Sequence, residues 1–75
     1  MKLSLRAARV NAGFSQEKLA KLIGVSKSTV SRWETGILPV PESLLLRICE
    51  ICSLRIDSVT ADVKKDALPE IKDNG

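Results

Sequence analysis

Apolar residues recur at helical spacing in several successive stretches of this 75-residue chain, and glycine or proline separates the stretches. In the first stretch Leu5 and Ala8 repeat at a three-residue interval, while arginines fall on another side of the same pattern. This spacing predicts a helix over Leu3–Ala12. Gly13 follows, and glycine readily takes the left-handed conformation that ends a helix.

A second helical pattern begins at Ser15, whose hydroxyl is suited to accept a hydrogen bond from a free backbone N–H at a helix start. An apolar stripe at three- and four-residue spacing follows, and Gly24 ends the pattern. The next pattern runs from about Lys27 to Thr35, with Ser26 as its predicted N-cap. The turn between the two helices is thus only Gly24–Ser26. Because so short a turn with glycine at its start makes two helices cross steeply, Ser15–Gly36 is typical of a helix-turn-helix unit.

The second helix of this unit has two different sides. Val30 and Trp33 are apolar and are expected to pack this helix against the core. Trp33 is therefore interpreted as a core residue and not as a ring on which the bases of single-stranded nucleic acid stack. Small polar and cationic residues occupy the rest, and they can present donors, acceptors and charge to an outside surface. These residues are Ser26, Lys27, Ser28, Ser31 and Arg32.

The remaining stretches complete a predicted all-α fold of five helices. Ile37–Pro41 is an extended connector without a charge, and a helix over Glu42–Cys52 follows. Arg55–Thr60 is expected to form a short fifth helix. We expect residues 1–60 to form the folded domain and residues 61–75, rich in charge, to form a flexible C-terminal tail.

Apolar residues exceed one stripe on the helix over Glu42–Cys52, and a small domain has little interior in which to bury them. We therefore expect this helix and the residues after it to form the interface of a homodimer. The candidate interface residues are Leu44, Leu46, Ile51, Leu54 and Ile56.

Charge is distributed unevenly along the chain. The net charge is +3, with seven cations and two anions in residues 1–39 and five cations and seven anions in residues 40–75. A basic N-terminal half favours a polyanionic partner. The alternative is an ordinary solvated surface whose charged residues are unevenly distributed by chance.

Composition also limits the class of protein. Apolar runs fall short of the roughly 20 residues that span a membrane, and arginines interrupt any N-terminal leader. The chain has no histidine, and Cys49 and Cys52 are too few for a closed zinc site, so we interpret both as packing residues. We expect a cytoplasmic protein that is not an enzyme and uses no metal, cofactor, membrane or small-molecule substrate.

With these residues laid out, the chain resembles the lambdoid phage repressor and Cro family of helix-turn-helix proteins (the XRE type) from about Leu3 to Val59. The specific segments are SQEKLA at positions 15–20, IGVS at 23–26, and VSRWE at 30–34 with Gly36. The resemblance implies a five-helix lambda-repressor-like domain in a bacterial or phage-infected cell. It also implies a double-stranded DNA partner, with the second helix of the motif in the major groove.

Carried over by position, the resemblance assigns roles to individual residues. Base readers are Lys27, Ser28 and Arg32, with Thr29 as an additional contact. Phosphate contacts are Ser15, Gln16, Ser26 and Thr35, although helix capping accounts for Ser15 and Ser26 as well. Arg9 and Glu34 match a family ion pair that is largely buried, and the alternative is two exposed charges of little energetic value.

One departure from the family concerns the connector, where relatives carry cations that hold phosphates. Gly36–Ser43 has no cation here and is one residue longer than in the family, which predicts fewer phosphate contacts or an apolar loop that packs on a partner. The leading hypothesis is a homodimeric, sequence-specific transcriptional regulator. The alternative is an antitoxin-type or adaptor module that binds another protein through the same helices.

Overall fold

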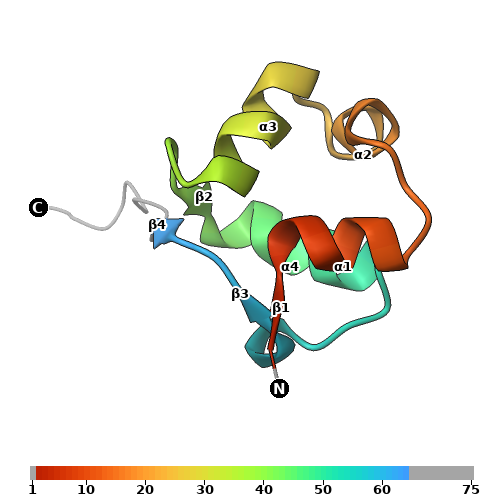
Figure 1. The fold of residues 1–75 in the computed structure, drawn as a ribbon, viewed down its shortest axis with the longest axis vertical. Coiled ribbons are helices and arrows are strands. Elements are labelled where there is room, and N and C mark those ends of the chain that lie inside the picture. Colours follow the sequence, from red (N-terminus) through yellow and green to blue (C-terminus); the bar gives the residue numbers. More distant parts are fainter. Residues whose placement is uncertain (1, 65–75) are drawn as a thin grey trace, which may run out of the picture.

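The computed structural model describes residues 2–64, which form a helical domain with short strands (Figure 1). Four α-helices and one 3-10 turn account for most of the described residues. The elements in chain order are β1 Leu3–Ser4, α1 Leu5–Asn11, α2 Gln16–Ile23, α3 Lys27–Thr35, β2 Val40–Pro41, α4 Glu42–Ile51, the 3-10 turn η1 Ile56–Ser58, β3 Val59–Thr60 and β4 Val63–Lys64.

The first helix begins two residues later than the pattern predicts. Ser4 is its N-cap, and Ser4 Oγ accepts a hydrogen bond of 3.0 Å from the backbone N of Ala7. Leu3 and Ser4 are extended instead, because β1 pairs in parallel with β3 in the register Leu3↔Val59. A pairing over so long a sequence separation leaves no local signal in the chain.

The expected fifth helix over Arg55–Thr60 is wrong. Only Ile56–Ser58 forms a 3-10 turn, and Val59 is extended, buried and paired with Leu3. A β-branched side chain suits this extended, buried position better than a helical one. The described residues therefore contain four α-helices and not five.

Two parallel ladders bring the end of the described chain back across the molecule. β3 lies beside β1, and β4 pairs with β2 in the register Pro41↔Lys64 (Figure 1). Ala61–Lys64, expected at the start of a flexible tail, thus extends along the folded domain. The rest of the predicted tail, residues 65–75, lies outside the described residues.

The core lies between α4 and the other three helices and includes residues from the strands. Its large, fully buried side chains come from α2, α3, β2 and α4. The fully buried large residues are Leu19, Val30, Val40, Leu45 and Ile48. No helix within residues 2–64 has both the length and the apolar character to cross a bilayer.

The apolar surplus of α4 is mostly covered within its own domain. Leu44 and Ile51 of α4, and Leu54 just after it, pack partly buried against the core. β2, β4 and η1 all contact α4. Of the five candidate interface residues, Leu46 is 48% exposed and Ile56 is 37% exposed. The expected apolar face is therefore smaller than the sequence pattern indicates.

Candidate nucleic-acid interface

The turn between α2 and α3 has the geometry that its residues predict. Gly24 takes a left-handed conformation, with φ 80° and ψ 32°, and its backbone N donates to the Ala20 carbonyl at 2.9 Å. Two residues later Ser26 caps α3, where its Oγ accepts from the backbone N of Thr29 at 3.2 Å. These local bonds fix the direction in which α3 leaves the turn.

An exposed ridge runs along α3. Lys27, Ser28 and Arg32 are exposed, whereas Val30 and Trp33 on the other side of the helix are buried in the core. Neither Lys27 nor Arg32 forms an ion pair with another residue in 2–64. Both cations are therefore available to an external ligand.

The hydroxyls at the start of α3 form a small cluster around the cap. Ser26 Oγ lies 3.1 Å from Ser28 Oγ and 2.9 Å from Thr29 Oγ1. Thr29 is half-buried, so it offers less surface to a ligand than Ser28. Ser26 lies in this cluster and not beside the other three predicted phosphate contacts.

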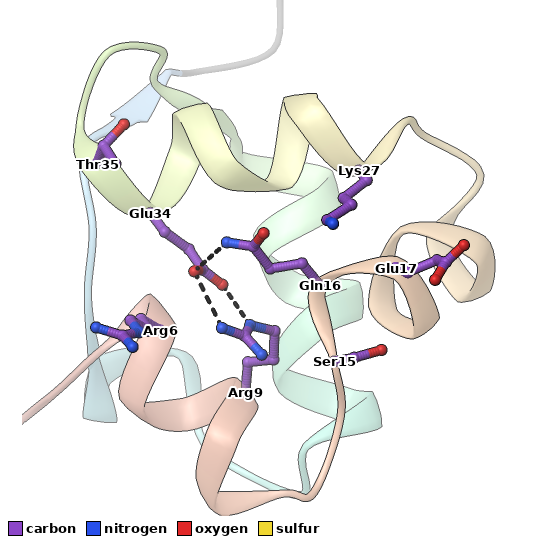
Figure 2. A pocket seen from close by; sticks show the side chains of 8 residues that line it. All are labelled: Arg6, Arg9, Ser15, Gln16, Glu17, Lys27, Glu34 and Thr35. Carbon is purple, nitrogen blue, oxygen red and sulfur yellow. Dashed lines mark hydrogen bonds and ion pairs between the residues drawn. The ribbon is translucent and has the colours of Figure 1, made fainter.

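Those three contacts meet in a hollow between α1, the start of α2 and α3 (Figure 2). The hollow has a volume of about 620 Å³. Its lining residues are Arg6, Arg9, Ser15, Gln16, Glu17, Lys27, Glu34 and Thr35. Three cations face two carboxylates, and the start of α2 adds the free N–H groups of a helix N-terminus. The groups that line the hollow therefore carry a net positive charge.

The hollow is held together by a buried ion pair. Arg9 Nε donates to Glu34 Oε2 at 2.5 Å and Arg9 Nη2 donates to Glu34 Oε1 at 3.2 Å, with 9% and 3% of the two side chains exposed. Arg9 Nη1 also donates to the Phe14 carbonyl at 2.7 Å. The structure thus contains the pair that the family resemblance implies, and the pair joins α1, α3 and the loop before α2.

Gln16 is part of the same network. Its Nε2 donates to Glu34 Oε1 at 2.9 Å, so the first residue of α2 is bonded to the end of α3 (Figure 2). The amide oxygen of Gln16 remains for other partners. Ser15 is exposed and caps α2 by accepting from the backbone N of Lys18 at 3.0 Å.

Thr35 is exposed at the other end of the hollow. Its Oγ1 donates to the Ser31 carbonyl at 3.1 Å and lies 3.3 Å from the Arg32 carbonyl. A hydroxyl that donates within its own helix has only its lone pairs left for a new contact. As a phosphate donor Thr35 would first have to rotate.

Arg6 is a residue of the hollow that the sequence did not single out. It lies on α1 one turn before Arg9, and it is exposed where Arg9 is buried. The signal in the sequence was the i,i+3 spacing of two arginines, which places both on one side of a helix. One arginine makes the internal pair and the other remains available at the surface.

Cys49 and Cys52 contribute to packing and not to the hollow. Cys49 is buried in the core and Cys52 packs partly buried against it, and both thiols are free. Burial raises the pKa of the Cys49 thiol, with a smaller contribution from Cys52, and burial also raises the pKa of Cys52. Residues 2–64 contain no group of three or more His, Cys, Asp or Glu side chains arranged for a metal ion.

Comparisons with known proteins agree with this geometry. Residues 3–60 match the sequence profile described as a helix-turn-helix domain. The uncharacterised HTH-type transcriptional regulator YgzD of Bacillus subtilis (strain 168) is 40% identical over 60 residues, which cover 79% of this chain and 89% of that protein. No solved structure matches the chain at a significant level. Because the profile spans most of the chain and includes every residue of α2, the turn and α3, the chain belongs to the helix-turn-helix domain family.

Proposed function

We propose that this protein is a sequence-specific, double-stranded DNA-binding transcriptional regulator of the repressor and Cro type, which acts in the cytoplasm as a homodimer. The observation that carries the proposal is the exposed ridge of α3. Lys27, Ser28 and Arg32 are exposed to solvent while the opposite side of the same helix is buried. A helix presented in this way fits the major groove of B-DNA.

Within this proposal Arg32 is the principal base reader. Its planar guanidinium matches the O6 and N7 acceptors of guanine with two hydrogen bonds, and such a contact discriminates by about 1–3 kcal/mol. Lys27 and Ser28 lie nearer the start of α3 and add contacts to neighbouring bases. Ser28 is less selective, because a hydroxyl both donates and accepts.

The hollow of Figure 2 is the proposed phosphate site. The N-terminus of α2, Gln16 and Arg6 lie beside the reading helix, where a DNA backbone would run along the edge of the groove. Because Gln16 also bonds to Glu34, a phosphate held there would be linked to the position of α3. The proposed activity is binding alone, without an enzymatic step.

Pairing of two copies would supply affinity that one short helix lacks. Two α3 helices about 34 Å apart across a two-fold axis would contact successive major grooves of a nearly palindromic operator. Leu46 and Ile56 are the exposed apolar residues among the candidate interface positions and are the proposed centre of the dimer contact.

A second candidate function rests on the exposed connector. Ile37 is 75% exposed and Leu38 is 39% exposed, directly after α3. Exposed apolar neighbours favour a protein partner, as in an antitoxin-type or adaptor module.

Selection from a pool of random DNA duplexes by electrophoretic mobility shift separates the two functions. The proposal expects enrichment of one nearly palindromic sequence at about 0.1 M salt, where non-specific binding is already weakened. Recovery of no common sequence, with any binding lost as salt rises, would contradict it and favour the protein-binding module. The control is a variant with Lys27, Ser28 and Arg32 all changed to Ala, for which no sequence should be enriched.

A further inference from the structure

The end of the described chain brings a cation to the connector that lacks one. The backbone N of Val40 donates to the Asp62 carbonyl at 2.7 Å, and the parallel register sets Lys64 opposite Pro41. The connector is also hydrogen-bonded to α3, since the backbone N of Leu38 donates to the Arg32 carbonyl at 3.2 Å. Lys64 is thus held beside α3 although 32 residues separate it from Arg32 in the chain.

Lys64 lines a second hollow, of about 360 Å³, between α3 and the connector. Its other lining residues are Thr29, Trp33, Leu38, Pro39 and Pro41, so Lys64 carries the one charge among the six. Lys64 is exposed, and its register position is set by backbone pairing and not by its own side chain.

The two hollows lie on opposite sides of the exposed ridge of α3. Lys27 and Glu34 line the hollow of Figure 2, whereas Thr29 and Trp33 line the second. At 3.6 residues per turn these two pairs point to different sides of the helix, with Ser28 and Arg32 on the surface between them. A helix seated in a major groove about 12 Å wide has one phosphate backbone along each of its sides.

The protein cations available to the two DNA phosphate backbones differ between the two sides of α3. The first hollow offers Arg6, Lys27 and the start of α2, while the connector Ile37–Pro41 and the residues on either side of it have no cation. β4 lies beside β2 in Figure 1, and Lys64 of β4 is one of the residues that line the hollow on this second side. A lysine on a flexible stem is suited to contact a phosphate as a point charge.

We propose that Lys64 contacts the DNA phosphate backbone on the connector side of α3, so that β4 is part of the nucleic-acid interface. This inference rests on the proposed DNA-binding function. It replaces the cations expected in the connector by one from a segment that pairs with the connector. It therefore predicts a steeper salt dependence than the connector sequence alone indicates.

The test measures binding of the full chain to two probes by fluorescence anisotropy between about 50 and 300 mM KCl. One probe is the duplex that the wild-type protein enriches from a random pool, and the other is an unrelated duplex of equal length. Lys64→Ala should reduce the slope of log K against log salt by about 0.9 and weaken both probes about fivefold to tenfold at 0.1 M salt. Lys64→Arg should retain wild-type binding, because it keeps the charge and the backbone pairing.

Arg47→Ala is the matched control, because this substitution removes one exposed cation from α4 and because Arg47 lines neither hollow. It should change the slope far less than Lys64→Ala does. If Lys64→Ala binds like the wild-type protein while Arg32→Ala is impaired, the inference is overturned and the proposed function stands. If the wild-type protein enriches no duplex, the proposed function fails and the inference fails with it. A loss confined to the enriched duplex would also overturn the inference, because a phosphate contact is independent of sequence.

Discussion

Gln16 and Glu34 join the start of one helix of the motif to the end of the other. Gln16 Nε2 donates to Glu34 Oε1 at 2.9 Å, and the same carboxylate accepts from Arg9 on α1. Three helices therefore meet at one buried carboxylate. The orientation of α3 depends on this network as well as on the short turn at Gly24.

Arg9→Met should destabilise the domain by about 3–5 kcal/mol, because it leaves the Glu34 charge buried without its main partner. Urea denaturation followed by circular dichroism measures the change. The double variant Arg9→Met with Glu34→Leu should recover part of the loss, since no unpaired charge remains. A loss below about 1 kcal/mol for Arg9→Met would mean that the pair behaves as an exposed one.

Gln16→Ala should weaken DNA binding on all sequences and cost about 1 kcal/mol of stability, because Glu34 loses one donor and keeps Arg9. Glu17→Ala is the control in the same helix turn. It removes a negative charge from the hollow and should strengthen binding, although α2 loses a favourable charge at its N-terminus. Anisotropy titrations of both variants against one duplex test this, and equal effects of both variants would contradict it.

The caps of the motif could be predicted from the sequence because they are local. Ser15 and Ser26 bond to backbone N–H groups three residues on, and Gly24 ends its helix in the left-handed conformation. The buried positions of α3 followed from spacing alone. The Arg9–Glu34 pair could be expected only from the family resemblance, since 25 residues separate its partners.

Non-local pairing accounts for the features that the sequence did not predict. β1 and β3 are two residues long, and so are β2 and β4, so neither ladder has a detectable alternating pattern. The β1–β3 pairing takes up residues that were expected in a fifth helix, and the β2–β4 pairing contacts α4 and sets Lys64 opposite Pro41. The secondary-structure propensity of neighbouring residues cannot predict contacts that form only between segments distant in the sequence.

Leu46→Glu should yield monomers that remain folded, because Leu46 is 48% exposed and a charge there disrupts an apolar dimer contact without entering the core. Leu44→Glu should unfold the domain instead, because Leu44 packs against the core. Sedimentation velocity and circular dichroism distinguish the two effects. An unchanged dimer for Leu46→Glu would place the interface elsewhere.

Stability should fall as pH rises through the range in which free thiols ionise, partly because burial raises the pKa of Cys49 above its ordinary value. Below that value both the folded and unfolded chains carry the neutral thiol, so its contribution is fully present. As pH rises, the unfolded chain loses the proton first and unfolding becomes more favourable. Cys49→Ala should show a smaller decrease between pH 8 and pH 10 in urea denaturation, and an equal decrease in both proteins would contradict the prediction.

Base recognition by α3 depends above all on Arg32. Sequence selection from random duplexes is carried out in parallel with wild-type protein, Arg32→Ala and the control Arg47→Ala. Arg32→Ala should enrich the wild-type motif with preference relaxed at one position of each half-site, while Arg47→Ala should enrich the wild-type motif unchanged. Uniformly weaker binding of Arg32→Ala, with every base preference retained, would contradict it and make Arg32 a phosphate contact.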